Sequence, residues 1–290
     1  MRYLVILAIL LANTTSLFAT DEQTLNDEKL ADLLFPSEHS VKLEQFPTFT
    51  AAEFNLLKEA VFQQLKLDEM CFVINHNETP HKFFNKYDLS GDGIVDVILS
   101  DYCGAMEIRT LIWLRKGDSA EYAGFIGGTP LKIYRNRKSD PFSIVVNEGW
   151  CCARNLGSIR LYKLAEDHGR LEYKLEKRIM QFKGVTVPST RMSSVFFKVK
   201  HDKYRLRSSP EILDQPGEVV GEEMIIGNII AEFPKGSSGE AIAEYRDKTG
   251  RVWWFVLMDQ NATTTINHFY DDKDSYKMGW MSSRYLEVVK

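Results

Sequence analysis

The stretch IRTLIWLRKGDSAEYAGFI, residues 108–126, shows the pattern that decides the fold class of this protein. It contains two short runs rich in β-branched and aromatic residues, 108–115 and 122–126, with the turn-forming residues RKGDSA between them. Runs of this length and composition separated by Gly, Asp and Ser are typical of two antiparallel strands joined by a hairpin.

Apolar runs of the same kind continue on both sides of this stretch. A second turn signal, EDHG at residues 166–169, separates two of them and predicts another hairpin. The sequence therefore predicts a mainly β protein with an antiparallel meander. The further predicted strands are Ile94–Leu99, Leu131–Tyr134, Phe142–Val146, Ile159–Leu164, Leu171–Leu175 and Val195–Val199.

One segment before the meander has helical periodicity. In TAAEFNLLKEAVFQQL, residues 50–65, Thr50 and Glu53 form a capping box ahead of apolar residues at helical spacing. We expect this helix to pack its apolar face on a sheet, which gives a helix-supported antiparallel β domain over residues 49–200. The preceding residues 20–48 are predicted to form a polar lead that is extended or weakly helical. The apolar positions of the helix are Phe54, Leu57, Val61 and Leu65.

Composition excludes some classes of function. The chain has 290 residues, of which 44% are hydrophobic and 12% aromatic, which is enough to build a core. Its formal net charge is −4. Nucleic acid is not an expected partner, because binding to phosphates requires a basic surface.

The first 19 residues, MRYLVILAILLANTTSLFA, have the pattern of a secretory signal peptide. A basic residue precedes an apolar run that is too short to span a bilayer, and small residues end the segment at Ala19. We expect cleavage near Ala19 and an exported protein, periplasmic or secreted, without a transmembrane segment after cleavage. An uncleaved anchor is the alternative.

Export would allow the four cysteines to form disulfides. Adjacent cysteines bridge each other only with strain, so Cys151 and Cys152 are expected to pair with Cys71 and Cys103, in an order that the spacing leaves open. A nucleophilic cysteine beside a distant histidine is the alternative.

The segment YDLSGDGIVDVIL, residues 87–99, places oxygen-bearing groups at alternate positions around two glycines. These offsets match the first nine positions of an EF-hand loop, but Leu99 stands where the bidentate Glu should be and a β run follows. The segment resembles the calcium loop of FG-GAP and VCBS-type repeats. That resemblance implies a structural Ca²⁺, and the alternative is a tight Asp/Gly turn that binds nothing. The ligands implied are the side chains of Asp88, Ser90, Asp92 and Asp96 and the carbonyl group of Ile94.

The last 90 residues carry three motifs in a characteristic order: YRLRSSP at 204–210, GRVWWFVLM at 250–258 and GWMSSRYLEV at 279–288. Together they resemble a bacterial SH3 (SH3b) domain, which implies a small β-barrel over residues 201–290. SH3b domains are commonly binding modules, and in cell-wall enzymes they attach the enzyme to peptidoglycan.

Aromatic residues in this region are the candidate ligand-binding groups. We expect Trp254 and Tyr285 in the core, whereas Trp253, Phe269 and Tyr270 are candidates for ligand binding. Gly279 is expected to allow a close turn before Trp280. The family's short hairpin is replaced here by a long polar insertion, residues 259–277.

These features predict an exported, non-catalytic envelope binding protein whose SH3b module binds a cell-wall peptide or a protein partner. No G-x-S-x-G, H-E-x-x-H or P-loop motif occurs in the sequence, so an enzyme is not expected. Two alternatives remain open. One is a peptidoglycan hydrolase or amidase with a divergent active site, and the other is an inhibitor or immunity-type protein that uses the insertion as a plug.

Overall fold

The architecture is mainly β, as the sequence predicts. A computed structural model describes residues 26–67, 84–103, 107–137, 140–148, 156–220, 223–262, 264, 266–267 and 274–289. None of the helices formed by these residues is long and apolar enough to cross a membrane.

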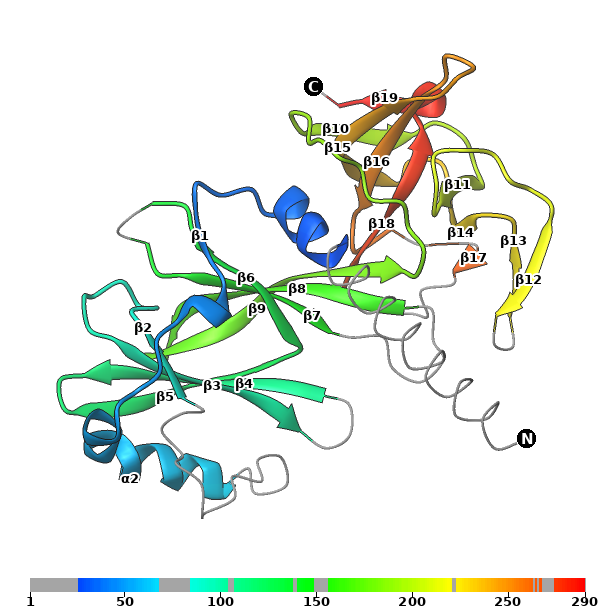
Figure 1. Cartoon of the computed structure of the whole chain (residues 1–290). Coiled ribbons are helices and arrows are strands. Elements are labelled where there is room, and N and C mark those ends of the chain that lie inside the picture. Colours follow the sequence, from blue (N-terminus) through cyan, green and yellow to red (C-terminus); the bar gives the residue numbers. More distant parts are fainter. Residues whose placement is uncertain are drawn as a thin grey trace, which may run out of the picture.

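A four-stranded antiparallel sheet carries the long helix (Figure 1). Its strands follow one another in chain order, and the predicted hairpin at Gly117 joins the last two. Helix α2 (Ala51–Leu67) packs its apolar face on this sheet, where Phe54 contacts Phe84 with the two ring centroids 4.7 Å apart. The strands are β2 (Phe84–Tyr87), β3 (Asp96–Cys103), β4 (Glu107–Lys116) and β5 (Ser119–Gly127).

The predicted capping box starts α2. The backbone amide of Thr50 donates to Glu53 Oε2 over 2.8 Å, and the amide of Glu53 donates to Thr50 Oγ1 over 3.3 Å. Two amides that lack partners inside the helix are thereby satisfied, which explains why the helix begins here.

The meander then passes into a second, larger sheet. Its antiparallel strands run in the order β1-β6-β7-β8-β9, and the predicted hairpin at His168 and Gly169 joins β8 to β9. Both turn residues have positive φ, at 49° and 81°, as a tight hairpin of this hand requires. The elements are β1 (His39–Val41), the short 3-10 helix η1 (Leu43–Gln45), β6 (Thr129–Arg135), β7 (Ser143–Glu148), β8 (Leu156–Asp167) and β9 (Arg170–Phe182).

The C-terminal strands extend this same sheet. All three SH3b-like motifs form strands, and β10, which lies before the predicted domain boundary at residue 201, pairs with β15 and β19 of the C-terminal part. Strands β12 and β13 form a separate two-stranded ribbon. The elements are β10 (Val195–Val199), β11 (Tyr204–Arg207), β12 (Pro216–Val220), β13 (Glu223–Ile226), β14 (Ile229–Phe233), β15 (Ser238–Arg246), β16 (Val252–Met258), β17 (Ile266–Asn267), β18 (Tyr276–Ser282), η3 (Ser283–Tyr285) and β19 (Leu286–Val288).

A parallel contact joins the meander to the C-terminal strands. Tyr276 and Lys277 of β18 lie beside Ile179 and Met180 of β9. The buried residues of both parts belong to one continuous hydrophobic cluster, in which Ile179 and Trp280 are both nearly inaccessible. The two parts are therefore packed together through a shared apolar core.

The lead segment is part of this core. Residues 26–34 form a helix that lies beside the large sheet (Figure 1). Its Leu30 and Ala31 are completely buried in the shared apolar core. Asp27, also buried, accepts a hydrogen bond from Asn147 Nδ2 over 2.6 Å, which fastens the helix to β7. Of the two predicted forms of the lead, the helical one is therefore found for these residues, whose few apolar side chains are buried in the core.

Candidate functional site

The predicted calcium loop is held together by its own backbone amides. Asp88 accepts hydrogen bonds from the amides of Gly91 and Gly93 over 2.8 and 3.0 Å, and Asp92 accepts one from the amide of Ile94 over 2.8 Å. These bonds close the turn that the two glycines allow. Ser90 adds a long contact of 3.5 Å from its hydroxyl to Asp88 Oδ1.

Asp96 differs from the other carboxylates because its side chain points into the protein. It is completely buried and accepts hydrogen bonds from the amides of Leu89, Ser90 and Arg115 over 2.8, 3.0 and 2.9 Å. Burial raises the pKa of Asp96 to about 6, and the three amide bonds oppose that rise. Asp96 thus links the loop to the end of β4.

These contacts bear on which residues could hold a metal ion. In the described part of the chain, no group of three or more His, Cys, Asp or Glu side chains is placed to hold one. Carboxylate oxygens each have two lone pairs, so the amide bonds leave acceptor capacity on Asp88 and Asp92. Calcium binding at this loop stays a prediction.

A pocket of about 250 Å³ opens beside the three SH3b-like motifs. It is formed where the start of β11, the start of β16 and the end of β18 with η3 come together. Pairing of Trp253 with Ser282 across β16 and β18 brings two of these segments side by side. Its lining is Lys203, Tyr204, Arg205, Arg207, Ile212, Arg251, Trp253, Ser282, Arg284 and Tyr285.

Aromatic side chains form the rigid part of the pocket. Trp253 is 1% exposed, and its indole Nε1 donates to Asp247 Oδ2 over 3.0 Å. Tyr204 donates its hydroxyl to the carbonyl oxygen of Ser282 over 2.5 Å, and its ring meets Tyr285 edge to face at 5.8 Å. Burial raises the pKa of Tyr204, which therefore stays neutral at physiological pH.

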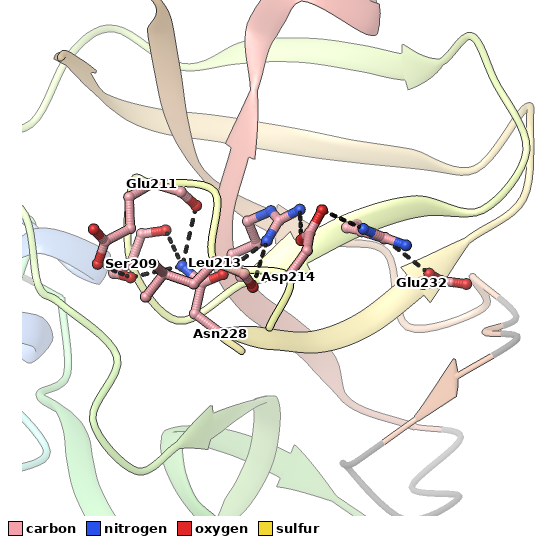
Figure 2. A network of polar contacts seen from close by, with 8 residues as sticks. Ser209, Glu211, Leu213, Asp214, Asn228 and Glu232 are labelled. Carbon is pink, nitrogen blue, oxygen red and sulfur yellow. Dashed lines mark hydrogen bonds and ion pairs between the residues drawn. The ribbon is translucent and has the colours of Figure 1, made fainter. Parts of the chain in front are cut away.

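An ion-pair network supports the opposite wall. Asp214 accepts from both Arg205 Nη1 and Arg207 Nη2 over 2.8 Å, and Glu232 accepts from Arg205 Nε over 3.1 Å. Figure 2 shows Asp214 in the middle of this network and Glu232 at one end. Burial acts to raise the pKa of Asp214, but the hydrogen bonds and charges of the two arginines outweigh it and lower that pKa.

The same network fixes the loop that carries Ile212. Asn228 donates through Nδ2 to the carbonyl oxygens of Ser209 and Glu211 over 3.2 and 3.1 Å, and accepts from Arg207 Nη1 over 2.8 Å (Figure 2). Arg207 is 6% exposed and lies beneath the loop. This wall of the pocket is therefore formed in the free protein, which lowers the entropy cost of binding.

The structure separates the predicted aromatic candidates. Trp253 lines the pocket, although little of it is exposed, whereas Phe269 and Tyr270 lie outside the described residues. Tyr285, expected in the core, is 39% exposed at the pocket, because η3 turns it outward. Trp254, also expected in the core, is only partly buried against it, and Trp253 is the one that belongs to the buried core cluster.

Gly279 also has a role different from the predicted one. It lies inside β18 rather than at a turn. A Cβ atom there would lie 2.7 Å from the carbonyl oxygen of Arg207, so glycine is needed for the close approach of β11. The neighbouring Trp280 is 2% exposed and donates its indole Nε1 to the carbonyl oxygen of Thr186 over 2.7 Å.

The predicted disulfides involve mostly undescribed residues. Cys71, Cys151 and Cys152 lie outside the described part of the chain, and Cys103 is the last residue of β3. Their pairing stays a prediction.

Sequence reasoning missed the cations of the pocket. Lys203, Arg251 and Arg284 each lie next to a residue of an SH3b-like motif or within one, as in GRVWW and SSRYL. Their positions beside the motif aromatics were the available signal. What linear spacing could not show is that three distant segments bring them to one opening.

The chain was compared with known proteins. No family model, no curated protein and no solved structure matches it. The resemblances to SH3b domains and to FG-GAP and VCBS-type loops therefore rest on the quoted residues alone.

Proposed function

We propose that this chain is an exported, non-catalytic binding protein of the cell envelope. Its C-terminal SH3b-like part binds a cell-wall peptide or an envelope protein, and its helix-supported part is an FG-GAP/VCBS-like domain. The observation that carries the proposal is the preformed pocket at the three motifs, whose aromatic and arginine side chains are the types that dominate binding energy at interfaces.

The chemistry of the lining favours binding over catalysis. Among the described residues, the ten that line the pocket include no His, Cys, Asp or Glu side chain that could act as nucleophile or general base. Tyr204, which lies in the wall of the pocket, is neutral, and its hydroxyl donates a hydrogen bond to the backbone carbonyl oxygen of Ser282. Such a lining suits recognition of a ligand that leaves unchanged.

The proposal is tested by co-sedimentation of the purified protein with cell-wall sacculi and by pull-down from envelope extracts. We expect retention of the protein on sacculi or on a defined envelope protein, with no soluble muropeptides released. Tyr285→Ala, which removes an exposed ring of the pocket, should reduce retention. Release of muropeptides would contradict the proposal and favour a hydrolase, and a titratable free thiol would support that alternative.

The proposal includes a structural calcium ion at residues 88–96. We expect calcium to raise the melting temperature relative to a chelator, because a ligand that binds only the folded state stabilises that state. Asp92→Asn should abolish this shift in melting temperature, because it removes the charge of a predicted calcium ligand. Asp92 is exposed, so the substitution leaves the buried contacts of Asp96 in place. Equal melting temperatures with calcium and with chelator would leave an empty Asp/Gly turn.

A further inference from the structure

The charges around the pocket do not balance. Five of the ten described residues that line it are cationic. Two of them, Arg205 and Arg207, are neutralised by Asp214 and Glu232 in the network of Figure 2.

The remaining three cations are Lys203, Arg251 and Arg284. Within the described ranges, none of their side chains has an acidic partner within ion-pair distance. Asp247 lies close to Arg251 in sequence, but its carboxylate accepts from the indole of Trp253 and from backbone amides instead. The described residues at the pocket therefore carry more positive than negative charge.

The arginines are placed against aromatic rings. The guanidinium of Arg251 lies 5.7 Å from the ring centroid of Trp253, and that of Arg284 lies 5.5 Å from that of Tyr285. A cation–π contact with a ring restricts an arginine, and its N–H groups can still donate hydrogen bonds. The two guanidinium groups suit carboxylates as ligands, because a carboxylate accepts two parallel hydrogen bonds from one guanidinium.

We propose that this pocket binds an acidic peptide, with Lys203, Arg251 and Arg284 holding its carboxylates. This inference rests on the proposed binding function and specifies its ligand. Apolar surface beside the cations argues for a peptide over a bare anion, since Ile212 is 49% exposed and faces the same opening as Tyr285. The volume, about 250 Å³, lies below that of drug-sized sites and suits one or two side chains.

The test is calorimetric titration of the purified protein with two hexapeptides, one alternating glutamate with leucine and the other glutamine with leucine. We expect the glutamate peptide to bind at least about tenfold more tightly, because charge-assisted hydrogen bonds are roughly twice as strong as neutral ones. Added salt should weaken it through screening. Lowering the pH below about 4 should abolish the difference, since glutamates become protonated while arginines stay charged.

Matched variants locate the site. Arg251→Gln with Arg284→Gln should weaken binding of the glutamate peptide about tenfold or more. Lys183→Gln with Lys198→Gln makes the same change in net charge at exposed positions outside the pocket and should leave binding unchanged. Equal losses in both pairs, or equal affinity for the two peptides, would overturn the inference.

Two further probes separate the possible outcomes. Inorganic phosphate that binds as tightly as the glutamate peptide, or binding only to vesicles of anionic lipid, would overturn the assignment to a peptide. Retention on sacculi that survives in Arg251→Gln with Arg284→Gln would overturn this inference and leave the proposed function standing. Tight binding of the glutamate peptide without retention on any envelope component would overturn the proposed function and leave this inference standing.

Discussion

Replacing Asp96 by alanine is expected to lower the free energy of unfolding by about 2–4 kcal/mol at pH 7. The carboxylate is completely buried, and it is the acceptor for the amides of Leu89, Ser90 and Arg115. Alanine leaves those donors without a partner where water has little access, and it opens a small cavity. Urea denaturation in the presence of chelator measures the change without any contribution from calcium.

Asp92→Ala is the control for this prediction. Asp92 lies in the same loop, but it is exposed and accepts only the amide of Ile94, two residues away. Water can replace that bond, so we expect a loss below about 1 kcal/mol. Equal losses in the two variants would contradict the role assigned to Asp96.

The pH dependence of stability provides a second readout for Asp96. Because burial raises its folded-state pKa to about 6 from an ordinary 3.8, the folded protein binds this proton more tightly than the unfolded chain. The contribution of this pKa difference to the free energy of unfolding is complete below pH 4 and is lost as the pH rises through 6. That contribution is at most about 3 kcal/mol. The loss caused by Asp96→Ala should therefore grow as the pH falls from 7 to 4. A loss that shrinks over that interval would show that the carboxylate is stabilised as an anion.

Gly227→Ala is the second substitution with a large expected effect. Gly227 has φ of +61°, and a Cβ atom there would lie only 1.7 Å from the carbonyl oxygen of Leu213. That carbonyl group accepts from the amide of Asn228 and from Arg207, so the loop cannot move without breaking the network under the pocket. We expect Gly227→Ala to lower the free energy of unfolding by more than about 3 kcal/mol, because backbone strain and the lost hydrogen bonds add up.

Gly236→Ala separates strain from the clash. Gly236 also has a positive φ, 90°, but nothing lies within 4 Å of a Cβ atom built on it. Gly236→Ala should lower the free energy of unfolding only by the cost of the left-handed conformation, about 1–2 kcal/mol. Denaturation curves of both variants, together with their affinity for the glutamate peptide, check this. Only Gly227→Ala should weaken binding, since only that change displaces the wall that carries Ile212, and similar behaviour of the two variants would contradict the account.

The elements that could be predicted are those that depend on neighbours in the chain. Short apolar runs and turn residues located strands β3 to β10 and both hairpins. The reciprocal bonds of Thr50 and Glu53 marked the start of α2. Hydrogen bonds between residues three positions apart and turns of two residues need no distant partner, so local composition is enough.

The tertiary structure decided what depends on distant partners. Nothing in the linear pattern indicates that β9 pairs in parallel with β18, or that residues 26–34 are covered by the large sheet. The four oxygen-bearing residues of the loop look equivalent in sequence, yet the strand direction turns only Asp96 inward, where burial dominates its pKa.

The pocket shows the same division. Sequence by itself determined the three motifs, and Trp253, one of its candidates for ligand binding, lies in the pocket wall with 1% of its surface exposed. Only the pairing of β18 with both β11 and β16 could bring Arg251 and Arg284 to one opening, while Asp214 and Glu232 pair with Arg205 and Arg207. Net charge at a site is the sum over side chains that long-range contacts bring together, and a local pattern carries no record of that sum.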